Sequence, residues 1–108
     1  MQTGNIIIVS FPYTDLVNYK ARPAVVVTQT KDNYSDVIVC LITSKIGEPI
    51  GTLQILLQPD STNNLKAPSL IKISRIATVE QDKILATIGK LSVSQLKEFK
   101  SLFKSLVD

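Results

Sequence analysis

The sequence predicts a mostly β, α+β fold in which a small curled barrel of antiparallel strands is followed by one C-terminal helix. Short β-branched runs bounded by turn residues recur along most of the chain. Helical spacing of apolar residues begins only after Gly89, and strands do not alternate with helices as they do in a doubly wound sheet. With 108 residues, the chain is expected to form a single domain spanning residues 1–108.

Five apolar runs are the expected strands. They are Ile6 to Val9, Ala24 to Thr28, Val37 to Thr43, Leu53 to Leu57 and Leu70 to Ile73. The second and third runs are apolar without alternation, which predicts burial on both faces and a place at the centre of the sheet. Closure of the strands into a barrel would leave no exposed edge strand.

A C-terminal helix is predicted after Gly89. Its apolar residues are spaced three or four apart and form one face, made of Leu96, Phe99, Leu102, Phe103 and Leu106. Ser92 and Gln95 form a capping box, and Leu91 and Leu96 occupy the staple positions around it. These signals place the start of the helix at about Ser92.

The composition excludes several classes of site. The chain has no histidine, which rules out a Cys/His zinc site, a Ser-His-Asp triad and a paired-histidine ribonuclease mechanism. The single cysteine, Cys40, cannot form an internal disulfide and is expected in the core. The net charge of +3 permits a polyanionic partner without requiring one.

No apolar run approaches the roughly 18 residues that a membrane span requires. The N-terminus has neither the basic segment nor the apolar core of a signal peptide. We therefore expect a cytoplasmic protein that does not associate with membranes. A chain of this length is also too short for a second domain enclosing a cofactor cleft, and no cofactor is expected.

The segment from Pro12 to Pro23 is predicted to be a polar loop, since it is longer than the two to five residues that a hairpin turn requires. It contains polar and aromatic residues suited to phosphate contact and base stacking, namely Tyr13, Thr14, Asp15, Tyr19 and Lys20. Pro23 biases Arg22 to an extended backbone at the mouth of a buried strand, where its guanidinium is a rigid phosphate donor. By composition alone, a solvated surface loop is an equally good interpretation.

Two further groups of polar residues accompany the predicted strands. They are Thr43, Ser44 and Lys45 at the end of one strand, and Lys72, Ser74 and Arg75 on and beyond the outward face of another. A strand-terminating turn and an ordinary polar sheet face are the simpler interpretations of each group taken alone.

Taken in order, these motifs resemble the MazF/PemK family of toxin-antitoxin ribonucleases. The matching segments are Gly4 to Ile6, Phe11 to Asp15, Lys20 to Val27, Ile42 to Ser44, Ser69 to Ile73, Arg75 to Val79 and Ile88 to Leu91, followed by the terminal helix. Each motif is short, but together they cover nearly the whole chain.

The resemblance implies an SH3-like small barrel that works as a homodimer and cuts single-stranded RNA without a metal at a short preferred sequence. It also implies an acidic antitoxin protein as a partner, which suits the basic charge of the chain. By position, Arg22 matches the family's catalytic arginine, and Thr43 and Ser44 match the hydroxyl pair that binds the phosphate. Lys72 lies where some members carry a second cation thought to protonate the leaving group.

Two positions depart from the family pattern. Ser74 stands where some members have an acidic residue as the general base, and Asn5 stands where an acid is often found near the N-terminus. The general base is therefore unassigned. The alternative function is a non-enzymatic binder on the same fold, either a gyrase-poison-like inhibitor or an antitoxin sink. A barrel that docks proline-rich peptides fits poorly, because the chain has no Trp and only 6% aromatic residues.

Overall fold

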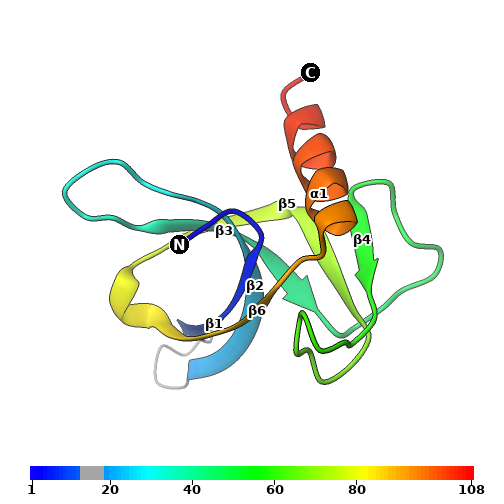
Figure 1. Cartoon of the computed structure of the whole chain (residues 1–108), viewed down its shortest axis with the longest axis horizontal. Coiled ribbons are helices and arrows are strands. Elements are labelled where there is room, and N and C mark those ends of the chain that lie inside the picture. Colours follow the sequence, from blue (N-terminus) through cyan, green and yellow to red (C-terminus); the bar gives the residue numbers. More distant parts are fainter. Residues whose placement is uncertain (13–18) are drawn as a thin grey trace.

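The computed structural model describes residues 1–12 and 19–108. Within these residues, strands make up most of the regular structure, and one α-helix follows them at the C-terminal end (Figure 1). The elements are β1 (Asn5–Pro12), β2 (Tyr19–Gln29), β3 (Val37–Thr43), β4 (Gln54–Leu57), β5 (Ser69–Val79), the short 3-10 helix η1 (Gln81–Lys83), β6 (Ile84–Lys90) and α1 (Val93–Ser105). No helix in the described part of the chain is long and apolar enough to cross a membrane.

The six strands named above form one antiparallel sheet in the order β4-β5-β3-β2-β1-β6. The continuously apolar strands β2 and β3 lie in its middle, as predicted. In β3, Cys40 packs in one core cluster with Phe99 of α1, whereas its neighbour Val39 packs in a second cluster with Val26. Because successive side chains of a strand point to opposite faces, both faces of the central strands are buried. The prediction of a mostly β fold with one C-terminal helix is confirmed.

Helix α1 begins where its capping residues predict. The Ser92 hydroxyl accepts a hydrogen bond from the Gln95 backbone N–H at 3.2 Å, and the Gln95 side chain accepts one from the Ser92 N–H at 3.0 Å. These bonds satisfy backbone donors that the first turn of a helix leaves unpaired. Phe99, which is 1% exposed, then anchors the helix against the sheet.

Cys40 is a core residue, as expected from its sequence. It is buried in β3, and its sulfur lies 3.4 Å from the carbonyl oxygen of Ile73 on β5. Burial raises the pKa of the Cys40 thiol to about 11, because the thiolate would lose its hydration there.

The sheet curls into a barrel-like shape but does not close, so the expectation that closure removes the edge strands is wrong. The end strands β4 and β6 are not paired with each other in the described structure. The loop of residues 58–68, here called the rim loop, spans the gap between them. The carbonyl of Thr62 accepts a hydrogen bond from the N–H of Lys90 at 3.0 Å, and the Asn64 amide donates to the carbonyl of Ile88 at 2.6 Å. β6 is therefore contacted by the rim loop rather than by β4.

Two strand segments have no counterpart among the predicted runs. They are β6 and the part of β5 from Arg75 to Val79. No residue of β6 is buried, and most of this part of β5 is exposed, so neither shows the apolar period of a half-buried strand. Backbone pairing holds them in place, β6 against β1 and β5 against β3.

Both ends of the predicted loop from Pro12 to Pro23 lie in strands, so the loop prediction is wrong there. β1 continues to Pro12 and β2 begins at Tyr19, and their ladder pairs Phe11 with Lys20. The two prolines that bound this segment are typical of turns in a sequence, and backbone hydrogen bonds maintain the ladder between them. Arg22 consequently lies within β2 rather than at its mouth, in the extended backbone that the following proline favours.

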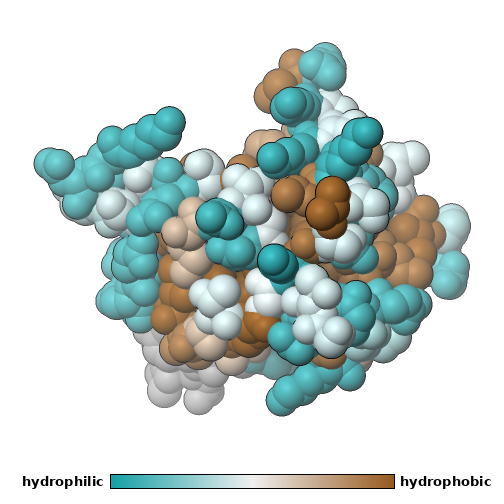
Figure 2. Space-filling model, in the orientation of Figure 1, coloured by the Kyte–Doolittle hydropathy of each residue, from teal (hydrophilic) through white to brown (hydrophobic). Residues whose placement is uncertain are grey.

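The turn between β2 and β3 extends away from the sheet (Figure 1), and Figure 2 shows that its surface is hydrophilic. One carboxylate oxygen of Asp32 accepts hydrogen bonds from the Thr30 hydroxyl at 2.9 Å and from the N–H groups of Tyr34 and Ser35 at 3.0 and 3.1 Å. The bond from Thr30, followed by that from Tyr34, lowers the pKa of Asp32 from its ordinary value of 3.8. The Asp32 side chain thus organises the turn, and the side chains of Gln29 and Gln81 add hydrogen bonds to the carbonyl of Ser35.

Candidate functional site

The candidate site begins where β2 and β3 separate. Pairing between these strands ends at Ala24, opposite Leu41. Beyond that point, Arg22 pairs with β1, and Ile42 and Thr43 pair with β5. Because the two neighbouring strands turn to different partners, the sheet opens there, and two pockets lie on either side of Arg22.

The first pocket has a volume of about 420 Å³, and we call it the cationic pocket. It is lined by Phe11, Arg22, Leu41, Ile42, Thr43, Lys72 and Arg75. No described residue forms an ion pair or a side-chain hydrogen bond with Arg22, Lys72 or Arg75. Three positive charges therefore converge without a counter-ion from the described chain, an arrangement that favours binding of an anion such as a phosphate.

Thr43 adds a hydroxyl donor to the cationic pocket. Its oxygen accepts a hydrogen bond from the backbone N–H of Lys45 at 3.1 Å. This bond orients the side chain and leaves the hydroxyl hydrogen for a ligand oxygen. Ser44 lines the other pocket, and the exposed side chain of Lys45 lines neither.

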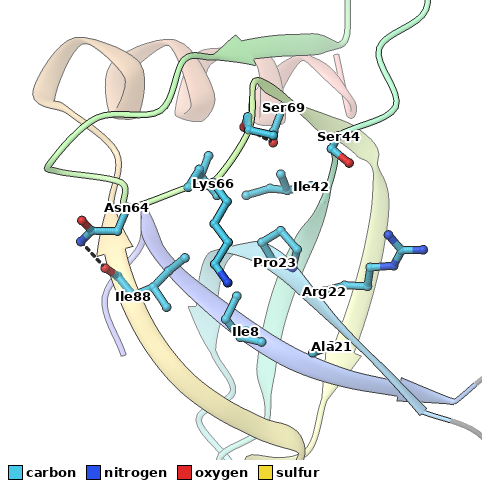
Figure 3. A pocket seen from close by; sticks show the side chains of 12 residues that line it. Ile8, Ala21, Arg22, Pro23, Ile42, Ser44, Asn64, Lys66, Ser69 and Ile88 are labelled. Carbon is cyan, nitrogen blue, oxygen red and sulfur yellow. Dashed lines mark hydrogen bonds between the residues drawn. The ribbon is translucent and has the colours of Figure 1, made fainter.

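The second pocket has a volume of about 470 Å³, and we call it the apolar pocket. It is lined by Ile8, Ala21, Arg22, Pro23, Ile42, Ser44, Asn64, Leu65, Lys66, Ala67, Ser69 and Ile88. Figure 3 shows the Lys66 side chain extending across this pocket, with its ammonium group beside Ile8 and Pro23. Arg22 lines both pockets, and its guanidinium points away from Lys66 (Figure 3).

Ser74 lines a third pocket, of about 350 Å³. Lys72 and Arg75 line both this pocket and the cationic pocket. Asn5 lies elsewhere, and its side chain accepts a hydrogen bond from the N–H of Gln2 at 2.9 Å. Neither position is a carboxylate, and none of the described residues that line the cationic or apolar pocket is Asp or Glu.

The structure brings together four of the residues singled out from the sequence, since Arg22, Thr43, Lys72 and Arg75 line one pocket. Lys20 is exposed and lines neither pocket. Tyr13, Thr14 and Asp15 fall outside the described residues, and the backbone of Tyr19 lies at the start of β2.

Sequence reasoning missed the rim loop as a wall of the site. Lys66, Ala67 and the adjoining Ser69 line the apolar pocket, yet none of them follows a recognisable motif. Their position depends on the contact between the rim loop and β6, which were not expected to meet. The apolar contributors Phe11 and Ile42 were missed because they resemble ordinary core residues in the sequence.

Comparisons with known proteins agree with this architecture. A family model described as the PemK-like, MazF-like toxin of type II toxin-antitoxin systems matches residues 2–107. Among solved structures, the Mycobacterium tuberculosis toxin MazF-mt6 has a similar fold, with a TM-score of 0.68 and 20% sequence identity. The match covers 94% of this chain and 93% of that chain. A comparison with curated protein sequences finds no match.

Proposed function

Because the chain belongs to the PemK-like, MazF-like toxin family of type II toxin-antitoxin systems, we propose that it is a metal-independent, sequence-selective endoribonuclease. Its substrate is single-stranded RNA in the cytoplasm. The observation that carries the proposal is the cationic pocket, in which Arg22, Lys72 and Arg75 converge without a counter-ion from a described residue.

The reaction is attack of a ribose 2′-hydroxyl on the adjacent phosphorus. It passes through a pentavalent phosphorane whose extra negative charge requires donors already in position. Arg22 stabilises this charge, because a guanidinium presents several N–H donors in a planar fork. The Thr43 hydroxyl, oriented by the N–H of Lys45, donates to a phosphate oxygen. Ser44, on the neighbouring wall, supplies a second hydroxyl.

The leaving 5′-oxygen requires a proton when its bond to phosphorus breaks. Lys72 lines the same pocket as Arg22 and is the proposed donor. Arg75 and Ser74 extend the site along the same strand, and Lys20, Lys45 and Tyr19 are proposed contacts for the RNA chain beyond it. The same role is proposed for Tyr13, Thr14 and Asp15.

Two partners complete the proposal. A second copy of the chain forms a homodimer, and an acidic antitoxin segment covers the cationic pocket when the toxin is inhibited. The unpaired cations support the second partner, since an acidic segment supplies the counter-charges that the described residues do not.

Cleavage-site mapping on a long, unstructured RNA in excess EDTA tests the function. We expect cuts at a recurrent short sequence, with 2′,3′-cyclic phosphate ends. Arg22→Ala should lower the cleavage rate about 100-fold or more, since it removes the main donor to the phosphorane. Lys100→Ala is the matched control, because it removes one positive charge from an exposed position on α1.

Equal rates for Arg22→Ala and the unmodified protein would show that the role of Arg22 is wrong. Loss of cleavage in EDTA that added Mg²⁺ restores would show that the reaction depends on a metal.

The absence of Asp and Glu among the described residues lining either pocket favours a second candidate, a non-enzymatic binder on the same fold. Such a protein would inhibit a large protein target or sequester an antitoxin. It predicts no RNA cleavage even at high protein concentration, together with tight binding of an acidic peptide that Arg22→Ala weakens.

A further inference from the structure

The rim loop that carries Lys66 is held by a buried side chain. Asn63 is 0% exposed, and its Oδ1 accepts hydrogen bonds from the N–H groups of Asp60 at 3.0 Å and Leu65 at 2.9 Å. Its Nδ2 donates to the carbonyl of Gln58 at 2.9 Å. One amide therefore joins three points of the loop, so the residue that follows Leu65 has a defined position.

The same loop is also held against β6. Besides the hydrogen bonds to Ile88 and Lys90, it packs directly on Gly89, where an added Cβ atom would overlap the backbone of Thr62 and Asn63. Leu65 is buried in the core cluster under α1. The wall that bears Lys66 is consequently as firmly placed as a strand, which is what a selective contact requires.

Among the described residues that line the apolar pocket, the cation besides Lys66 is Arg22, whose guanidinium points away from it (Figure 3). The Lys66 ammonium extends over Ile8 and Pro23, with Ile42 and Ile88 lining the same pocket (Figure 3). No described residue pairs with it. The apolar walls favour the flat face of a nucleobase, and the pocket offers a phosphate less positive charge than the three cations of the cationic pocket do.

We infer that the apolar pocket holds an unpaired nucleobase next to the phosphate bound in the cationic pocket, and that Lys66 selects a base with a carbonyl at its edge. This inference rests on the proposed function. An ammonium group donates three hydrogen bonds and accepts none. It can therefore bind O4 of uracil or O6 of guanine, but it repels the amino group that cytosine and adenine carry at the equivalent position. Lys66 is thus a specificity-determining residue.

Uracil and cytosine make matched probes, because they have the same size and differ at C4. We would measure fluorescence anisotropy of 2′-deoxy octamers of uridine and of cytidine, which cannot be cleaved, with the unmodified protein and with Lys66→Met. We expect the unmodified protein to bind the uridine octamer about tenfold more tightly, and Lys66→Met to reduce the difference to about twofold or less. Lys66→Arg retains the donors and should keep the preference.

Lys100→Met is the control, since it removes the same charge from α1 and should leave the preference unchanged. Two outcomes would overturn the inference alone: equal binding of both octamers by the unmodified protein, or an unchanged preference in Lys66→Met. An unchanged preference with both octamers weakened equally, and a salt dependence reduced by about 0.7 in slope, would make Lys66 a phosphate contact. No binding of either octamer by the unmodified protein would overturn the proposed function as well.

Discussion

The two pockets that meet at Arg22 are built in different ways. The described residues that line the cationic pocket all belong to β1, β2, β3 and β5. The apolar pocket takes four of its lining residues, Asn64 to Ala67, from the rim loop. Ladder hydrogen bonds therefore position the first pocket, whereas the second depends on a buried amide and on contacts with β6. The strands thus position the residues of the proposed chemistry, whereas the rim loop positions the residue of the proposed selectivity.

The largest effect on activity is expected in the strand-built pocket. Lys72→Ala should lower kcat about 100-fold, because proton donation to the leaving oxygen contributes in this range. KM should change little, since Arg22 and Thr43 still hold the phosphate. Single-turnover cleavage assays over a range of RNA concentrations would separate the two parameters.

Lys97→Ala, on the exposed face of α1, is the control for loss of charge. A rise in KM with unchanged kcat would mean that Lys72 binds the phosphate and takes no part in proton transfer.

A large effect on stability is expected from the rim loop. Asn63→Ala leaves the N–H of Leu65 and two other backbone groups without their partner, and should lower the free energy of unfolding by about 3 kcal/mol. Thermal unfolding followed by circular dichroism would show this as a clearly lower Tm.

Asn33→Ala, at an exposed position of the β2–β3 turn, should change the stability by less than about 0.5 kcal/mol. If Asn63→Ala were equally mild, the rim loop would not depend on the buried amide, and the contrast between the two pockets would weaken.

A smaller effect concerns β3, which contributes to both pockets. Because burial raises the pKa of Cys40 from 9.0 to about 11, the neutral thiol is favoured in the folded protein. Its contribution to stability is complete below pH 9 and is lost as the pH rises through 11. Iodoacetamide should leave the native protein unlabelled at pH 8 and label it in urea. Rapid labelling of the native protein would show that β3 opens. The strand that lines both pockets would then not be rigid.

The smallest effect is expected far from both pockets. The lowered pKa of Asp32 means that its carboxylate stabilises the turn above pH 3.8, and that this contribution is lost as the pH falls below that value. The amide NMR signals of Tyr34 and Ser35 should titrate with an apparent pKa below 3.8 and stop doing so in Asp32→Asn. Cleavage by Asp32→Asn should equal that of the unmodified protein, and a loss would mean that this turn affects the pockets.

The parts of the fold that the sequence reveals are those in which apolar side chains carry the signal. β3 was predicted with its observed bounds, Val37–Thr43, because every residue up to Ile42 is apolar and the strand is buried on both faces. The start of α1 was predicted because Ser92 and Gln95 cap it through their own side chains. β6 and the β1–β2 ladder beyond Val9 were missed, since backbone atoms hold them and backbone atoms are the same in every sequence.

The candidate site shows the same division. Arg22, Thr43 and Lys72 were singled out because motifs surround them, and the strands bring them to one pocket. Lys66 was missed because its place over Pro23 follows from the contact of the rim loop with β6, a long-range event with no local pattern. Lys66, on which selectivity is proposed to depend, could therefore not be identified from a local sequence motif.

Gly89 allows the rim loop to pack closely against β6. The rim loop is held to β6 by hydrogen bonds with the carbonyl of Ile88 and the N–H of Lys90, and by close packing on the backbone of Gly89. These contacts are made by backbone atoms of β6. Lys66 is exposed, whereas the buried side chains of Asn63 and Leu65 hold the loop in place. Under the proposed function, we expect a library randomised at Lys66 and Ala67 to contain variants that select other RNA sequences.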